Sequence, residues 1–178
     1  MVFILKSTYQ DSYKEKMKYM ATTGMLAALI TLMTAYICHV PVGINGGYIH
    51  LGDAIIYLAA AILPRPYALA AAAIGGGLAD VLTAPMWAPA TIVIKMLIVL
   101  PFTNKGAGVI NKRNVAATLA AYLISGVGYY VAERLMFEAG ALFWVSMAQA
   151  ALQAFGSGVV FVMLGVALDK AKIKRRIQ

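Results

Sequence analysis

Charged and amide side chains interrupt an otherwise apolar sequence at a few positions. A charged group costs about 2.5–3.5 kcal/mol to insert at the centre of a bilayer, so such groups usually mark a functional site. The candidates for contacting a substrate are Asp53, Asp80, Lys95, Gln149 and Gln153. The two glutamines are four residues apart and therefore share one face of a helix. This combination of carboxylate, ammonium and amide groups indicates a small polar ligand held by a few hydrogen bonds.

Aromatic side chains accompany these polar groups along the chain. Trp87, Tyr129 and Trp144 can stack on a flat ligand, although tryptophans also gather where a membrane meets water. Asn45 and His50 lie in a glycine-rich loop and complete the set of candidate binding residues. We therefore expect the ligand to be a flat heteroaromatic molecule.

Each charged or amide candidate also has a purely structural explanation. Asp80 and Lys95 can form a buried ion pair, and Asp53 can accept backbone N–H groups at the start of a helix. Gln149 and Gln153 can join two helices without touching a ligand. The sequence leaves these alternatives open.

The composition places these residues in a membrane protein. Of the 178 residues, 62% are hydrophobic and 12% are charged, and the mean hydropathy is +0.79. Soluble domains average about 45–50% apolar and about 25% charged residues, so an ordinary soluble enzyme or a disordered chain is excluded. The single cysteine excludes a disulfide scaffold. At about 20 residues per span, the length predicts an all-α fold, a single domain of six transmembrane helices over residues 1–178.

Prolines and glycines divide the apolar sequence into six segments. The expected spans are residues 20–40, 51–63, 67–82, 88–102, 115–132 and 141–168. A polar segment at 1–19 precedes them, and a basic tail at 169–178 follows them. The second span is short for a bilayer, so we expect it to be tilted or partly re-entrant.

The distribution of positive charge predicts the orientation. Most of the 15 Lys and Arg residues lie in the two terminal segments and in the loop at 103–114. Cytoplasmic segments are enriched in these residues, so both termini are expected on the cytoplasmic side of the plasma membrane. The net charge of +8 then reflects membrane topology, and no nucleic-acid partner is expected.

With this orientation, the polar candidates gather in the outer half of the helix bundle. A channel would need polar groups through its whole depth, whereas a pocket open to the outside needs them only there. The sequence has neither a G-x-x-x-x-G-K-[ST] phosphate loop nor an H-E-x-x-H motif, and its two histidines lack the further ligands of a metal site. We therefore expect no catalytic residue, metal or cofactor in this chain.

Three other classes of membrane protein are alternatives to a substrate-binding subunit. An intramembrane enzyme would use Asp53, Asp80 or His50 as an acid or base and would turn over a substrate. A structural protein would use its polar residues only to join helices and would bind no ligand. A self-sufficient carrier would transport without ATP, but the internal repeat typical of many such carriers is not evident. The main interpretation is a binding subunit that takes its energy from partners.

Three stretches resemble one transporter family. Residues 47–54 (GYIHLGDA) are similar to the start of the second span in the substrate-binding (S) components of energy-coupling factor (ECF) vitamin transporters. Residues 77–82 (GLADVL) resemble the G-x-x-A-D stretch of that family, and residues 87–95 (WAPATIVIK) resemble its A-P-x-T-x-x-I-K continuation.

The resemblance implies a six-helix fold that captures a vitamin outside the cell, with the loop at 41–50 as a lid. It also implies three partners, a coupling transmembrane subunit and two cytoplasmic ATPase subunits, and it is these ATPases that would use ATP. The family docks on its coupling subunit through an A-x-x-x-A face of the first span. Gly24 and Ala28 occupy the corresponding positions here, and small residues at this spacing allow close helix contact.

The resemblance is closest to members assigned to riboflavin, hydroxymethylpyrimidine or pyridoxine. The inferred pocket suits a small pyridine or pyrimidine, so the expected ligand is pyridoxine-like or hydroxymethylpyrimidine-like, with a riboflavin- or thiamine-type ligand as the alternative. Lys95, Gln149 and Gln153 are expected to hydrogen-bond this ligand, and His50 or Asp53 to connect the lid to it.

Overall fold

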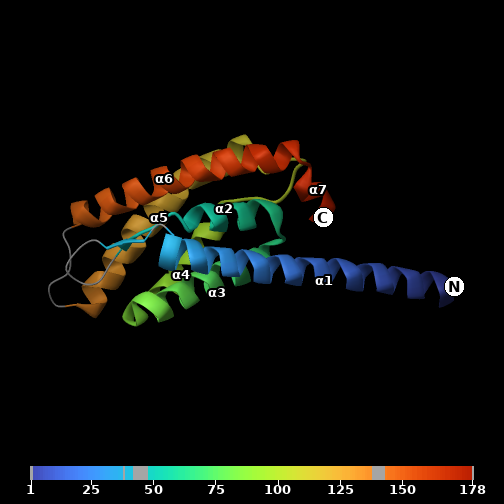
Figure 1. Cartoon of the computed structure of the whole chain (residues 1–178), viewed down its shortest axis with the longest axis horizontal. Coiled ribbons are helices and arrows are strands. Elements are labelled where there is room, and N and C mark those ends of the chain that lie inside the picture. The colour runs from blue at the N-terminus through green and yellow to red at the C-terminus, as the bar shows by residue number, and fades with distance from the viewer. Residues whose placement is uncertain (1, 38, 42–47, 138–142, 178) are drawn as a thin grey trace.

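The computed structural model of the chain describes residues 2–37, 39–41, 48–137 and 143–177. These residues form a helix bundle with one short β-hairpin on it (Figure 1). In chain order the elements are α1 (Val2–Leu32), the π-helical turn η1 (Met33–Ile37), β1 (Val40–Pro41), β2 (Tyr48–Ile49), α2 (Asp53–Ile62), α3 (Arg65–Thr83), the 3-10 turn η2 (Pro85–Trp87), α4 (Ala88–Val99), α5 (Lys112–Met136), α6 (Phe143–Lys170) and α7 (Ile173–Ile177).

The predicted all-α architecture is confirmed, and six apolar helices follow one another in the predicted order. Among the described residues, four segments are long and apolar enough to cross a membrane. They are Tyr13–Ile37, Arg65–Thr83, Lys112–Met136 and Phe143–Lys170. The apolar helices at Asp53–Ile62 and Pro85–Val99 are shorter. A short second segment agrees with the sequence, and the fourth, expected at 88–102, is short as well.

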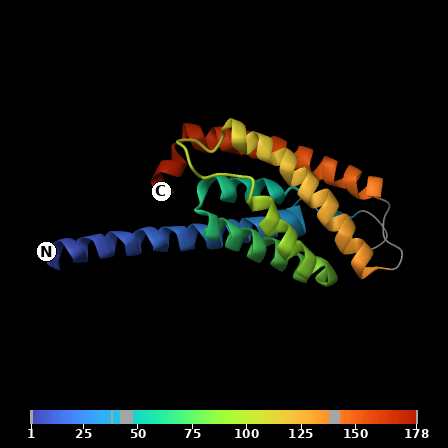
Figure 2. The same ribbon diagram turned by 180° about the vertical axis from the view of Figure 1, so that it is seen from behind.

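Prolines end both short helices. Leu63 at the end of α2 is extended because Pro64, which follows it, disfavours a helical conformation in the preceding residue. The last turn of α4 is followed by Pro101. At the amino terminus no proline or glycine precedes Gly24, so α1 continues from Val2 through the segment expected to be a polar tail. Figure 2 shows this part of α1 extending well beyond the other helices.

Helix α2 forms the centre of the bundle. All ten of its residues are buried, and it contacts α1, α3, α4, α5 and α6. In Figure 1 it lies between α6 and α1. Because these five helices surround it, the start of α2 lies in the interior of the bundle.

Helix α3 approaches its neighbours closely because glycines line two of its faces. A Cβ atom added to Gly75 would lie 2.6 Å from Cβ of Ile30 on α1, and one added to Gly76 would lie 2.9 Å from Cγ of Lys95 on α4. The hydroxyl group of Thr31 donates a hydrogen bond to the carbonyl oxygen of Gly75 at 3.1 Å. These contacts hold α1, α3 and α4 together and bring the Lys95 side chain against α3.

The exterior of the bundle is apolar. Large hydrophobic side chains are exposed along α5 and α6, including Leu119, Phe155 and Met163, which are 65%, 73% and 68% exposed. A soluble monomer rarely exposes apolar surface on this scale. The helices therefore present these faces to lipid.

Candidate functional site

A buried ion pair lies at the start of α2. The Nζ atom of Lys95 is 2.6 Å from Oδ1 of Asp53, and each side chain is only 1% exposed. The amide group of Gln153 donates a hydrogen bond to the other oxygen of Asp53, Oδ2, at 2.8 Å. Three helices, α2, α4 and α6, thus meet at a single carboxylate.

The surroundings of Asp53 test two of the structural alternatives, its role as a helix cap and the pairing of Lys95 with Asp80. Asp53 is the first residue of α2, where the partial positive charge of the helix end favours a carboxylate. The residue at the capping position is Gly52, and no side chain caps the helix by a hydrogen bond. Of the structural alternatives left open by the sequence, the capping role of Asp53 is therefore not found, and the ion pair of Lys95 forms with Asp53 and not with Asp80.

The segment that joins the β-hairpin to α2 is hydrogen-bonded to the residues around this ion pair. Strands β1 and β2 pair antiparallel, with Val40 opposite Ile49 and Pro41 opposite Tyr48. Immediately after β2, the backbone N–H of His50 donates a hydrogen bond to Oε1 of Gln153 at 3.3 Å. Gln153 thereby bridges the hairpin and the ion pair, since its amide group donates to Asp53 while its carbonyl accepts from His50.

The imidazole of His50 is buried and neutral. Its Nδ1 atom accepts a hydrogen bond from the backbone N–H of Gly52 at 3.0 Å and lies 3.5 Å from the hydroxyl oxygen of Thr34. Burial, together with the positive charge of Lys95, lowers the pKa of His50 to about 3. The ring therefore positions the turn into α2 without carrying a charge at physiological pH.

A second set of polar side chains lies beside the ion pair. The hydroxyl group of Tyr48 donates a short hydrogen bond to Oδ1 of Asp80. The hydroxyl groups of Thr91 and Tyr129 are 3.0 Å apart and share a hydrogen bond. The Lys95 ammonium lies 5.4 Å from the centre of the Tyr129 ring, within the range of a cation–π contact. The hairpin, α3, α4 and α5 therefore all contribute to one polar cluster.

Aromatic rings border this cluster. The rings of Trp87 and Tyr129 meet edge to face with their centres 6.0 Å apart. The ring centre of Phe137 lies 5.5 Å from that of Trp87. On the hairpin side, His39 stacks on Tyr48 at 4.0 Å. Flat faces thus lie next to hydrogen-bonding groups, which is the combination that binds a planar heteroaromatic molecule.

The structure unites some of the predicted residues and separates others. The cluster contains most of the predicted residues, namely Asp53, Asp80, Lys95, Gln153, His50, Tyr129 and Trp87. Trp144 is 78% exposed and contacts the ring of Phe143, on the outer face of α6. Gln149 is half-buried, one turn from Gln153. Asn45 lies outside the described residues.

Two members of the cluster, Tyr48 and Thr91, were not selected from the sequence. Thr91 precedes Lys95 by four residues, so helical spacing places both on one face of α4 and could have indicated its role. Tyr48 stands in the glycine-rich stretch that precedes Asp53, but its contact with Asp80 joins residues 32 positions apart. That contact depends on how the hairpin folds over α3, which spacing alone does not reveal.

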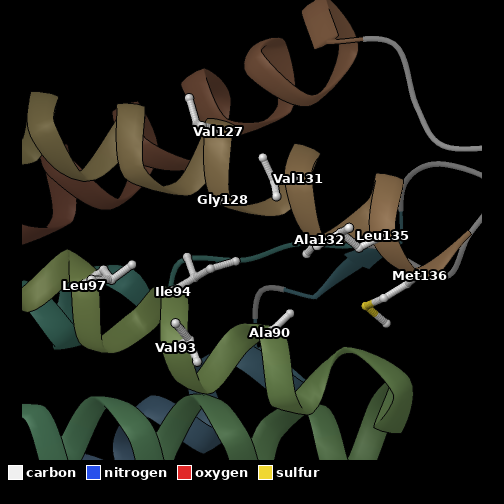
Figure 3. Close-up of a pocket in the computed structure, with 10 residues that line it drawn as sticks. All are labelled: Ala90, Val93, Ile94, Leu97, Val127, Gly128, Val131, Ala132, Leu135 and Met136. Atoms are coloured by element: carbon white, nitrogen blue, oxygen red, sulfur yellow. The ribbon is translucent and has the colours of Figure 1, made fainter.

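An apolar groove of about 500 Å³ lies on the outer surface between α4 and α5 (Figure 3). Ala90, Val93, Ile94 and Leu97 face α5 across it, and residues between Val127 and Met136 form the opposite wall. The lining includes Leu135, which is 83% exposed. Because its walls are almost entirely aliphatic, the groove belongs to the lipid-facing surface, whereas the polar cluster is the candidate binding site.

On the outer face of α1, Gly24 and Ala28 are both exposed. A Cβ atom added to Gly24 would have no atom within 4 Å among the described residues. This face of α1 is free to contact another helix at short distance.

Comparison with known proteins gives the family. The family model described as "ECF-type riboflavin transporter, S component" matches residues 14–170, a range that contains the entire polar cluster. A search of curated proteins found no match. S components are membrane-embedded transport subunits and not enzymes, so the transport interpretation is confirmed and the intramembrane-enzyme alternative is wrong. The match covers most of the chain, which therefore belongs to the family of ECF-type riboflavin transporter S components.

Proposed function

We propose that this chain captures riboflavin, or a flavin closely related to it, and delivers it into the cell as the S component of an ECF importer. The observation that carries the proposal is the family match over residues 14–170, whose description specifies riboflavin. Riboflavin was the alternative to the pyridoxine-like or hydroxymethylpyrimidine-like ligand expected from the sequence. The match favours this alternative over that main expectation.

The chemistry of the cluster is compatible with a flavin. A flavin combines a flat tricyclic ring, a hydrogen-bonding imide edge and a hydroxylated side chain. The rings of Trp87, Tyr129 and Tyr48 supply flat contact surfaces, and Asp80 and Gln149 supply polar groups at the same end of the bundle. Ligand sites in proteins combine apolar and aromatic walls with a few polar groups in this way.

The energy for transport is proposed to come from partners. The sequence has no phosphate-binding loop, so ATP would be hydrolysed by two cytoplasmic ATPase subunits joined through a coupling transmembrane subunit. The exposed Gly24 and Ala28 face of α1 is the proposed contact with the coupling subunit. The basic terminal segments support a plasma-membrane orientation with both termini in the cytoplasm.

A binding titration tests the proposal. The detergent-purified chain is titrated into riboflavin while the quenching of flavin fluorescence is followed, and pyridoxine, hydroxymethylpyrimidine and thiamine are tested as competitors. We expect saturable binding of riboflavin with one site per chain and no displacement by the three competitors. Binding of pyridoxine or hydroxymethylpyrimidine without binding of riboflavin would reverse the proposed ligand assignment.

A further inference from the structure

The carboxylate of Asp80 has one oxygen atom that the fold leaves unsatisfied. The side chain is only 3% exposed, and its Oδ1 atom accepts the hydrogen bond of Tyr48. Within the described part of the chain, no donor makes a hydrogen bond to the other oxygen, Oδ2. Buried polar atoms are nearly always hydrogen-bonded, so an exception of this kind calls for an explanation.

The neighbouring cation does not satisfy this oxygen. Lys95 binds Asp53 at 2.6 Å, and Asp53 receives a second hydrogen bond from Gln153 at 2.8 Å. The ion pair is therefore complete without Asp80. The hydroxyl group of Thr91 also interacts with Asp80, but its hydrogen bond at 3.0 Å is with the hydroxyl group of Tyr129. Asp80 is thus a buried acceptor whose Oδ2 remains available to a donor from outside the fold.

The surroundings of Asp80 indicate what kind of donor this is. Tyr48, which bonds to Asp80, stacks on His39 with the ring centres 4.0 Å apart. Thr91 shares a hydrogen bond with Tyr129, and the Tyr129 ring contacts that of Trp87. Aromatic surfaces therefore flank the carboxylate on the hairpin side and on the side of α4 and α5. A planar molecule resting against these surfaces would direct the edge of its ring, and not an alkyl chain, towards Asp80.

We propose that Asp80 selects the ligand by accepting a hydrogen bond from a ring N–H group, which for a flavin is its imide N–H. This inference rests on the proposed function, because it assigns a role to one residue of the same site. An ionised carboxylate only accepts hydrogen bonds. A ligand that lacks the N–H group would leave the buried oxygen unsatisfied, and leaving such a group without a partner lowers affinity more than losing one contact between exposed groups.

The test compares riboflavin with riboflavin methylated at the imide nitrogen. Dissociation constants are measured for the wild-type chain, for Asp80→Asn and for Asp169→Asn. The wild-type chain should bind riboflavin about tenfold or more tighter than the methylated compound, as expected for a hydrogen bond to a charged group. Asp80→Asn keeps the shape of the side chain and should remove most of this difference.

Asp169→Asn is the matched control because it makes the same chemical change at a different place. Asp169 accepts hydrogen bonds from the backbone N–H groups of Val109 and Ile110 at the far end of α6. This variant should retain the wild-type ratio of the two affinities. A ratio, unlike a single dissociation constant, is unchanged when a variant merely lowers the fraction of folded protein.

A third ligand, lumiflavin, separates the ring from the hydroxylated side chain. Lumiflavin has the imide N–H but lacks the polyol, so Asp80→Asn should weaken its binding by about the same factor as that of riboflavin. Weakening for riboflavin alone would mean that Asp80 binds the polyol and would overturn the inference. An unchanged ratio of riboflavin to methylated riboflavin in Asp80→Asn would overturn it as well. If the wild-type chain bound no flavin at all, the proposed function itself would fail, and this inference with it.

Discussion

At the scale of single residues, the molecule concentrates its polar chemistry around one buried ion pair. Asp53 and Lys95 are both 1% exposed, and isolated charges at such depth would be strongly unfavourable. The pair is tolerated because Gln153 and the amino-terminal end of α2 satisfy the same carboxylate. The pair therefore responds to substitution asymmetrically, since removing one partner lowers the stability of the fold far more than removing both.

This asymmetry gives a test by double substitution. Lys95→Met leaves Asp53 buried and unpaired, so it should lower the free energy of unfolding by about 3–5 kcal/mol. Asp53→Asn in the same chain removes the unpaired charge and should recover most of that loss. Thermal unfolding of the detergent-purified single and double variants measures both effects. Additive losses in the double variant would contradict the ion pair.

The buried, neutral His50 predicts a dependence of stability on pH. Its pKa is lowered to about 3 in the folded chain, whereas an unfolded histidine has a pKa of about 6.5. Between these values the unfolded state binds more protons, so the contribution of His50 to stability is complete above about pH 6.5 and is lost as the pH falls towards 3.

Thermal unfolding at a series of pH values between 7.5 and about 5 tests this prediction. Each unit below the unfolded pKa should remove at most about 1.4 kcal/mol. In His50→Asn the side-chain oxygen can still accept a hydrogen bond from Gly52, but no group titrates there, so the decline should be shallower. Equal slopes for the variant and the wild-type chain would show that His50 does not carry the effect.

At the scale of elements, the position of a residue on its helix decides whether the side chain reaches the site. Gln149 and Gln153 lie one turn apart on α6, yet Gln153 bonds to Asp53 and to His50, whereas Gln149 is half-buried. The outer face of the same helix carries the exposed Trp144. One helix thus presents two glutamines on one face, one of them structural and the other a candidate for ligand binding, and a lipid-facing tryptophan on another face.

The two glutamines form a matched pair for substitution by alanine. Gln153→Ala removes hydrogen bonds to a buried carboxylate and to a buried backbone N–H, so it should lower the free energy of unfolding by about 1–3 kcal/mol. Gln149→Ala should leave thermal stability nearly unchanged and should instead weaken riboflavin binding about tenfold. Thermal unfolding and a binding titration on both variants separate the two roles. The interpretation would be wrong if Gln149→Ala were the more destabilising of the two.

The sequence was sufficient to predict the six apolar helices, but not the β-hairpin, the helical start of α1 or all of the contacts. Hydropathy and the prolines located six apolar helices, and the ionisable residues within them identified most of the cluster. Which carboxylate pairs with Lys95 could not be predicted, because Asp53 and Asp80 lie at similar depths and the choice depends on how α4 is rotated against α2 and α3. The same limit applies to Trp87 and Trp144, since only packing shows that one is buried and the other exposed.

At the scale of the whole molecule, ligand capture and partner contact use different faces. The polar cluster lies inside the bundle at the start of α2, whereas Gly24 and Ala28 lie on the outer side of α1. Close helix contact requires small residues at such a face. A bulky side chain there should interfere with assembly while leaving the interior intact.

Gly24→Leu tests this separation. A Cβ atom at Gly24 meets no atom within 4 Å among the described residues, so riboflavin affinity and thermal stability should stay close to wild type. Copurification with the coupling subunit and riboflavin uptake by cells should be lost. Gly75→Leu is the contrasting control, because its Cβ would lie 2.6 Å from Ile30 and should destabilise the fold itself. Normal uptake by Gly24→Leu would exclude this face of α1 as the docking site.

The central claim, that this chain is a flavin-capturing S component, is tested most directly by native mass spectrometry. The protein is purified in detergent from cells grown with a mixture of vitamins, and any small molecule that remains bound is released and identified. We predict one riboflavin per chain, lost in a variant that carries both Asp80→Asn and Gln149→Ala. A chain that carries a pyridine or pyrimidine vitamin in place of a flavin would contradict the account.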